Sequence, residues 1–249
     1  THGAPSARNA HPHSGQTGRV VVVQNGIVEN FLELREELSA EGVEFKSDTD
    51  TETIVHLVEH YLASGLDLTE AARKTFQHIR GANVVVLMSA DEPDKIVTAR
   101  IGNAGGVVVG YGEDEMFVAS DVPAILEHTR RVVFLESRQM AIVSRDGARV
   151  ETLEGKQEQP EVHVVAWDPV AAEKGEYRHF MQKEIHEQAR ALTDTLAGRV
   201  DFERGKIRLP ELNLTPELAQ RIQKIYITAC GTAAYAGMVG KYLIEKIAR

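Results

Sequence analysis

The sequence predicts an α+β fold, because helical patterns come first and antiparallel strand patterns follow. Three segments between residues 29 and 79 carry apolar residues at helical spacing. Between residues 83 and 153, short valine-rich segments alternate with Gly or Asp turns, as in an antiparallel meander. Segregated helices and strands favour an α+β arrangement over a doubly wound sheet. A helix, strand and helix pattern from residue 215 onward predicts the beginning of a separate, parallel α/β domain.

The expected elements follow in chain order. Residues 1–18 are rich in His, Pro, Ser and Gly without periodicity, so they are predicted to form a loop before a strand at 19–24. Gly42 ends the first expected helix, and the polar cluster at 47–50 offers caps for the second. Helices are expected at 29–41, 51–63 and 68–79, and strands at 83–88, 95–101, 106–110, 116–119, 131–135, 139–144 and 149–153.

A linker is indicated by the polar segment 154–161 and the Pro- and Gly-containing segment 168–177. We therefore expect a first domain over 1–165, an interdomain linker over 166–214 with a helix at 180–196, and a second domain that begins at 215–249. Its elements are a helix at 216–222, a strand at 224–229 and a helix at 233–248. The chain starts at Thr1 without a Met or a signal-like leader, and helical spacing continues to its end, so we expect a piece of a longer protein.

The composition excludes several classes of function. With 37 acidic and 28 basic residues, the net charge of -9 disfavours nucleic acid and anionic membrane surfaces as partners. The longest apolar runs are far shorter than the roughly 20 residues that cross a bilayer. The single cysteine, Cys230, excludes an internal disulfide and a multi-thiolate zinc site, and fits a reducing cytoplasm.

Two polar clusters have both a structural and a chemical interpretation. Asn25-Gly26 after a valine strand is typical of a hairpin turn, but a side-chain amide beside an open backbone N–H is also what an oxyanion hole requires. Asp48 and Asp50 either cap the helix that starts at Thr51 or hold a substrate ammonium group.

The histidine-rich start of the chain has further alternatives. His2, His11 and His13 are candidate metal ligands, although no carboxylate or thiolate completes a set at ligand spacing, and a polar loop is the other interpretation. Thr1 is a candidate N-terminal nucleophile on the strength of its position alone.

Four motifs in series resemble the class II glutamine amidotransferase family. They are Thr1-His2-Gly3, Asn9-Ala10-His11-Pro12-His13, Gln24-Asn25-Gly26-Ile27-Val28-Glu29-Asn30 and Ser47-Asp48-Thr49-Asp50-Thr51-Glu52. Two later blocks, Ala119-Ser120-Asp121 and the segment from Glu173 to Ile185, resemble the glutamine:fructose-6-phosphate aminotransferase branch. Cys230-Gly231-Thr232 looks like the opening of a sugar isomerase (SIS) domain, so the resemblance covers essentially the whole chain.

The resemblance implies a fold and a set of glutamine-site residues. The fold would be an N-terminal-nucleophile αββα sandwich, incomplete at its N-terminus, followed by the start of an SIS domain. Asn25 and Gly26 match the family's donors to the oxyanion formed on glutamine. Asp50 matches the carboxylate for the substrate α-ammonium, and Thr1 and His2 match the end of a substrate-binding loop. The nucleophilic interpretation of Thr1 then falls, because the family's catalytic cysteine would precede this chain.

The resemblance also implies the remaining properties. Cys230, Gly231 and Thr232 match a sugar-phosphate site, while Gln24 replaces a frequent His and Ala233 a usual Ser. The parent protein would be a cytoplasmic transferase that uses glutamine and fructose 6-phosphate, needs no metal or organic cofactor, and assembles as a homo-oligomer through its isomerase domains. The isolated chain is expected to be inactive. The alternatives are a non-catalytic phosphosugar-binding regulator and another class II glutamine amidotransferase.

Overall fold

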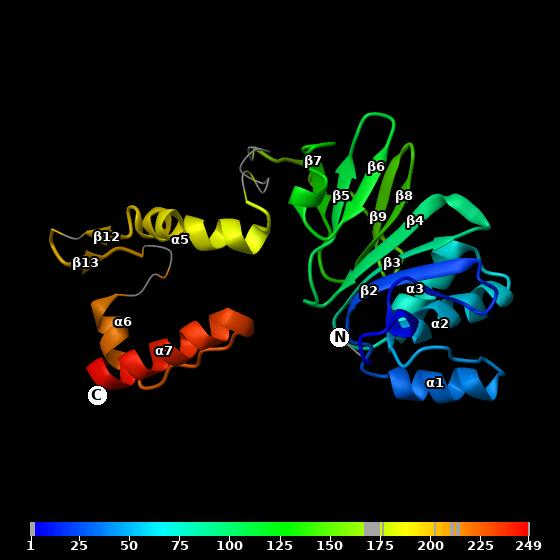
Figure 1. Ribbon diagram of the computed structural model, residues 1–249, viewed down its shortest axis with the longest axis horizontal. Coiled ribbons are helices and arrows are strands. Elements are labelled where there is room, and N and C mark those ends of the chain that lie inside the picture. The colour runs from blue at the N-terminus through cyan, green and yellow to red at the C-terminus, as the bar shows by residue number, and fades with distance from the viewer. Residues whose placement is uncertain are drawn as a thin grey trace. The chain divides into compact units, whose positions relative to one another are not determined.

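The computed structural model describes residues 3–166, 175, 177–201, 203–209, 212 and 215–248. The chain divides into two compact units, Thr1–Gly175 and Glu176–Arg249, and each is described by itself (Figure 1). Most expected helices and strands of the first unit are present, with bounds that differ by a few residues at most.

Three helices form one layer of the first unit. They are α1 (Phe31–Ala40), α2 (Thr51–Ala63) and α3 (Leu68–His78). The side chain of Asp67 caps α3 by accepting from the Glu70 N–H over 2.8 Å. Leu34 and Leu38 of α1 are buried, whereas Leu32, which shares the apolar pattern of that helix, is 62% exposed.

A seven-stranded antiparallel sheet lies beside these helices. Its order is β1-β2-β3-β4-β8-β9-β10. The strands are β1 (His13–Ser14), β2 (Val20–Gly26), β3 (Asn83–Ser89), β4 (Glu92–Ile101), β8 (Gln139–Ser144), β9 (Gly147–Thr152) and β10 (Gln157–Glu158). The segment 1–18, expected to be loop throughout, contributes β1 and a short 3-10 helix at Ala7–Asn9.

A second, four-stranded antiparallel sheet has the order β11-β7-β5-β6. Its strands are β5 (Val108–Tyr111), β6 (Met116–Ala119), β7 (Arg131–Phe134) and β11 (His163–Val164). The chain forms β5, β6 and β7 after leaving β4 and before it returns to pair β8 with β4.

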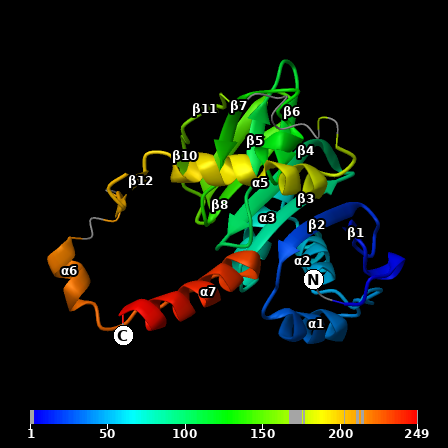
Figure 2. The same ribbon diagram turned by 60° about the vertical axis from the view of Figure 1, so that its left-hand side comes forward.

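Three apolar clusters give the order of the layers. The largest joins α1, α2 and α3 to the seven-stranded sheet, with Val20, Val22 and Phe76 among its members. A second joins the two sheets through residues such as Val84 and Val133. The third covers the outer face of the four-stranded sheet with the 3-10 turn Val122–Ala124 and its neighbours. The layers are therefore helices, sheet, sheet, as Figure 2 also shows.

The second unit differs more from the sequence prediction. Its elements are α5 (Phe180–Leu196), β12 (Val200–Asp201), β13 (Lys206–Ile207), α6 (Pro216–Arg221) and α7 (Gly231–Ala248). The strand predicted at 224–229 is wrong, because residues 222–230 form no regular element. A strand needs a hydrogen-bonded neighbour, and in the described part of this unit only β12 and β13 pair, antiparallel. The start of a parallel α/β domain is thus not shown.

Across the part of the chain that the structure describes, no helix combines the length and the apolar character needed to cross a membrane.

Candidate functional site

Three segments of the first unit meet at the C-terminal end of β2. The last residues of β2 pair with the start of β3, with Gly26 opposite Asn83. The segment that follows β2 is tied to the beginning of α2, because the Val28 N–H donates to Asp50 Oδ2 over 2.7 Å. The structure thereby brings three predicted site residues, Asn25, Gly26 and Asp50, to one end of the sheet.

Asn25 lies on the face of β2 opposite to the helices. Its side chain is exposed, while the neighbouring Val22 and Gln24 are buried on the helix side. The Asn25 Nδ2 donates to the Ala104 carbonyl over 2.7 Å, across a separation of 79 residues. The carboxamide carries two N–H donors, and this contact with the turn after β4 uses one of them and fixes the plane of the group.

Gly26 has a backbone conformation that a larger residue cannot adopt there. Its φ is +132°, and a Cβ atom at this position would lie 2.1 Å from the Ala82 carbonyl oxygen. The Asn25-Gly26 pair is not a hairpin turn, because β2 continues through Gly26 and the chain then leads into α1. Glycine is therefore required by the close approach of β3.

Asp50 is 2% exposed and immediately precedes α2. Its side chain makes no capping hydrogen bond to that helix, so the capping interpretation is wrong for Asp50. Asp48 is instead exposed and forms an ion pair with Arg8 over 2.9 Å. The two aspartates thus differ sharply in environment, and only Asp50 faces the segment after β2.

Gln24 of β2 is hydrogen-bonded to β3 and to α2, a role that the sequence analysis did not predict. It is 9% exposed, its Nε2 donates to Asn83 Oδ1 over 2.7 Å, and its Oε1 accepts from the Thr51 hydroxyl over 2.8 Å. His11 Nε2 lies 3.2 Å from the same Thr51 oxygen. The signal was present in the alternation of Val20, Val22 and Gln24, which places a polar residue on a buried face.

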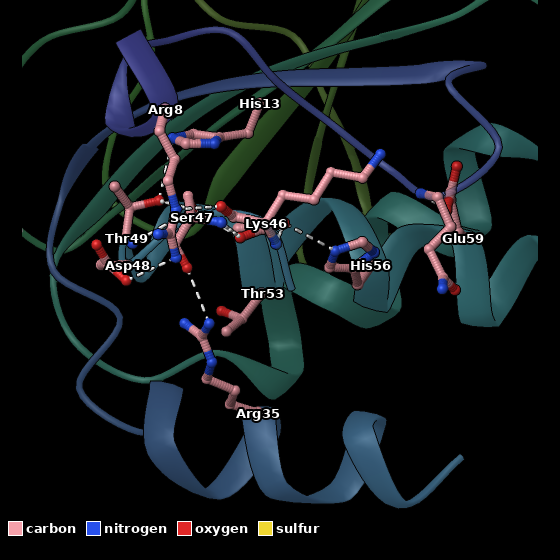
Figure 3. Close-up of polar contacts among 12 residues, drawn as sticks. Arg8, His13, Arg35, Lys46, Ser47, Asp48, Thr49, Thr53, His56 and Glu59 are labelled. Atoms are coloured by element: carbon pink, nitrogen blue, oxygen red, sulfur yellow. Dashed lines mark hydrogen bonds and ion pairs between the residues drawn. The ribbon is translucent and has the colours of Figure 1, made fainter. Parts of the chain in front are cut away.

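A buried carboxylate organises the loop that leads to Asp50. Glu52 accepts from the backbone N–H groups of Lys46 and Ser47, each over 2.7 Å, and from the Ser47 hydroxyl over 2.6 Å. Ser47 contacts Thr49 over 2.9 Å, and Thr49 contacts His13 Nε2 over 3.0 Å. His56 Nε2 lies 3.3 Å from Glu52 on the helix side (Figure 3). These polar groups form one connected network beneath the loop.

Two arginines hold this loop from outside. Arg8 donates to the Lys46 carbonyl and pairs with Asp48, while Arg35 of α1 donates to the Ser47 carbonyl over 2.8 Å. Figure 3 shows the two side chains reaching the loop from opposite sides. The Arg35 guanidinium also stacks 4.3 Å from the centre of the Phe45 ring.

Burial shapes the protonation of this network. Burial alone would raise the pKa of Glu52, but the hydrogen bonds from Ser47, Lys46 and His56 outweigh it and hold that pKa below its usual value. Burial lowers the pKa of His56, against the opposing effect of Glu52. Burial, aided by the neighbouring His11, also lowers the pKa of His13. The network therefore favours an anionic Glu52 between neutral imidazoles.

The remaining predicted site residues lie elsewhere. Thr1 and His2 are outside the described residues. Cys230 is exposed in the second unit and directly precedes α7, whose first two residues are Gly231 and Thr232. No group of three or more His, Cys, Asp or Glu side chains suited to a metal ion occurs within the described ranges.

The sequence is similar to known proteins. Residues 4–127 match the glutamine amidotransferase domain. The chain is 47% identical over 248 residues to the glutamine–fructose-6-phosphate aminotransferase (isomerizing) of Symbiobacterium thermophilum, and 46% identical over 249 residues to that of Thermus thermophilus. Each match covers 100% of this chain and 40% of the relative, so the chain spans about 40% of the length of these relatives.

Solved structures support the fold. The glutamine phosphoribosylpyrophosphate amidotransferase from B. subtilis, complexed with ADP and GMP, has a TM-score of 0.51 at 22% identity, covering 60% of this chain and 33% of that one. An allosteric regulatory enzyme of purine biosynthesis has a TM-score of 0.50 at 22% identity, covering 59% and 31%. At this identity the likeness concerns the mixed α/β fold alone. The match over residues 4–127, just under half of the chain, identifies that segment as a glutamine amidotransferase domain.

Proposed function

We propose that this chain is a segment of an enzyme that makes glucosamine 6-phosphate from fructose 6-phosphate with ammonia released from glutamine. The assignment is supported by the similarity of the whole chain, at 47% and 45% identity, to about 40% of the length of two glutamine–fructose-6-phosphate aminotransferases (isomerizing). The observation that carries the glutamine half is the meeting of Asn25, Gly26 and Asp50 at the end of β2. A non-catalytic phosphosugar-binding regulator is not favoured, because the matched domain is a glutamine amidotransferase domain.

Asn25 and Gly26 stabilise negative charge in this proposal. A thiol that gives up its proton attacks the glutamine carboxamide carbon and turns its oxygen into an oxyanion in a tetrahedral intermediate. The nitrogen gains a proton and leaves as ammonia, and water then hydrolyses the thioester that remains. The Asn25 side-chain amide and the Gly26 backbone N–H are the donors to that oxyanion. Such donors act best when they are held rigidly before the charge develops, and the contact of Asn25 with Ala104 supplies that rigidity.

Asp50 binds the other end of glutamine. Its carboxylate pairs with the α-ammonium group of the substrate. Thr1 and His2, which lie outside the described residues, are proposed as further glutamine-binding residues. The hydrogen bond from the Val28 N–H holds this carboxylate toward the segment that follows β2. The thiol nucleophile belongs to a part of the enzyme outside this sequence.

The second unit is proposed to open the isomerase part of the enzyme. Residues 1–165 are the amidotransferase domain, 166–214 the linker, and 215–249 the start of the SIS domain. Cys230, Gly231 and Thr232 at the start of the 18-residue α7 contribute to the sugar-phosphate site. The full enzyme is proposed to be cytoplasmic and to assemble through its isomerase domains.

The first experiment removes the oxyanion donor. In the full-length protein, Asn25→Ala is expected to lower kcat for glutamine hydrolysis by about 10²- to 10³-fold with little change in KM, because the donor acts mainly on the transition state. Val23→Ala, two residues earlier on the same face of β2, serves as the control. An Asn25→Ala enzyme as fast as the control would contradict the proposed role.

The second experiment separates the two aspartates. Asp50→Asn is expected to raise KM for glutamine at least tenfold, because the ammonium loses its counter-charge. Asp48→Asn removes a carboxylate from the same loop that is exposed and paired with Arg8, so its KM is expected to stay within twofold of the wild type. Equal KM values for both variants would remove Asp50 from the site.

A further inference from the structure

Gln24 is a buried amide in an apolar setting. Val20, Val22 and Gln24 alternate on the face of β2 that packs against the helices, and Gln24 is 9% exposed there. Burying a carboxamide is unfavourable unless its donors and acceptor are paired. The side chain is paired at both ends, so its position depends on two specific neighbours.

Each neighbour adjoins one half of the proposed glutamine site. The Oε1 of Gln24 accepts from Thr51, the first residue of α2, which follows Asp50 directly. The Nε2 of Gln24 donates to Asn83, which lies opposite Gly26 in the pairing of β2 with β3. Gln24 itself precedes Asn25. One side chain thus spans the distance between the ammonium-binding carboxylate and the oxyanion donors.

We propose that Gln24 is a positioning residue for glutamine hydrolysis, which fixes the start of α2, and with it Asp50, relative to Asn25 and Gly26. This inference rests on the proposed function. Glutamine must meet the carboxylate at one end and the donors at the other at the same time. A displacement of about 1 Å between such groups is enough to cost a large factor in rate.

The direction of the two hydrogen bonds makes the role specific to a neutral group with one donor and one acceptor. Asn83 donates from Nδ2 to the Arg80 carbonyl over 3.3 Å, which turns its Oδ1 toward Gln24. An ionised carboxylate at position 24 would face that oxygen without a proton to donate. A neutral imidazole has one donor and one acceptor and meets both requirements.

The chain offers a matched control at Gln139. This glutamine is 8% exposed, accepts from the Glu136 N–H over 2.7 Å, and donates to Glu158. It lies on β8, which is separated from β2 by the two strands β3 and β4. Gln24→Leu and Gln139→Leu each remove two hydrogen bonds from a buried amide, so a merely structural role predicts the same kinetic result for both.

The test measures glutamine hydrolysis by the full-length protein, together with thermal unfolding. Gln24→Leu is expected to lower kcat/KM at least tenfold, with KM for glutamine raised at least fivefold, whereas Gln139→Leu stays within twofold in both. Gln24→His is expected to recover kcat/KM to within about threefold of the wild type at pH 8. The kcat/KM of Gln24→Glu is expected to fall, relative to the wild type, as pH rises through the pKa of the new carboxyl group.

Several outcomes overturn the inference. The inference is wrong if Gln24→Leu has the same kinetics as Gln139→Leu. It is also wrong if Gln24→Glu has the same pH profile as the wild type. If Gln24→Leu does not fold, the inference is tested by the pH profile of Gln24→Glu and by the kcat/KM of Gln24→His. A loss of rate in Asn25→Ala with no effect at Gln24 leaves the proposed function in place and removes this inference alone. A wild-type protein that does not hydrolyse glutamine overturns the proposed function itself.

Discussion

Glu52 and Ser47 are joined by two hydrogen bonds to the same oxygen, since the backbone N–H and the hydroxyl of Ser47 both donate to Glu52 Oε2. Both residues are at most 2% exposed. The carboxylate therefore satisfies buried donors of the turn that leads to Asp50, which water cannot reach. We expect its negative charge to stabilise the first unit.

Glu52→Gln is expected to lower the free energy of unfolding by about 1–3 kcal/mol at pH 7, because the amide turns a donor toward backbone N–H groups that need an acceptor. Urea denaturation followed by circular dichroism measures this. Glu36→Gln on the exposed side of α1 is the control, with a change expected within about 0.5 kcal/mol. Equal stabilities of the two variants would contradict the role of Glu52.

The lowered pKa of Glu52 also sets a pH dependence. A carboxyl group whose pKa is lower in the folded state contributes stability above its unfolded pKa of about 4.3, and that contribution is lost as pH falls through the folded value. Wild-type stability is expected to fall more steeply below pH 4.5 than that of Glu52→Gln. Parallel curves for the two proteins would show that the carboxylate is not preferentially stabilised.

His56 should act in a higher pH range. Burial lowers its pKa, so the folded state resists its protonation, and stability falls as pH drops below the unfolded value of about 6.5. Its Nδ1 has no hydrogen-bond partner in the described structure, and its ring packs against Phe45 at 4.9 Å. His56→Phe keeps a ring and cannot titrate, so its stability is expected to vary less between pH 7 and pH 5. His60→Phe, at an exposed position on the same helix, is the control for these denaturation curves.

Alanine substitutions at two glycines distinguish the effect of backbone strain on stability from that of a steric clash. Gly147 has a φ of +148° and open space around a Cβ, so Gly147→Ala is expected to cost about 1–3 kcal/mol through backbone strain alone. At Gly26 the new Cβ would also meet the Ala82 carbonyl, so Gly26→Ala should destabilise by about 4 kcal/mol or more. Thermal unfolding of the two variants measures the difference, and similar melting temperatures would show that β3 can move away.

The ion pair between Arg73 of α3 and Glu151 of β9 is largely buried, with atoms 2.6 Å apart. Glu151→Gln is expected to destabilise the first unit by about 3 kcal/mol, because the Arg73 guanidinium loses its buried carboxylate and keeps the partly exposed Glu70 and the Thr152 carbonyl. Asp91→Asn removes the partner of Arg19 at an exposed pair and should cost less than about 1 kcal/mol. Denaturation in 1 M salt should preserve this contrast, since only the exposed pair is strongly screened.

Local patterns predicted the first unit well where the pattern and the packing agree. The bounds of α2, β6 and β8 match the prediction to the residue, because polar or turn-forming residues flank their apolar spacing. The strand β4 starts at Glu92, three residues before the predicted start. It includes Pro93, because Glu92 already pairs with Ser89 of β3. The strand expected at 224–229 is wrong because its β-branched composition is not matched by a neighbouring strand.

The candidate site was predicted less completely than the fold. Motifs identified Asn25, Gly26 and Asp50, but the bonds of Gln24 join residues 27 and 59 positions away. Capping of α2 was one of two alternatives for Asp50, whereas its carboxylate accepts from the Val28 N–H. Such contacts depend on how the layers pack, which a periodic pattern in one segment does not contain.

The insertion of β5, β6 and β7 between β4 and β8 has a consequence for how the first unit folds. Arg100 of β4 pairs with Gln139 of β8, so about 40 residues of chain must be placed before the centre of the seven-stranded sheet can close. Neither sheet is continuous in sequence, and the two should therefore gain protection from hydrogen exchange together. Folding should be slow for a unit of this size, because this pair and the pair of β2 with β3 both join strands that are far apart in sequence.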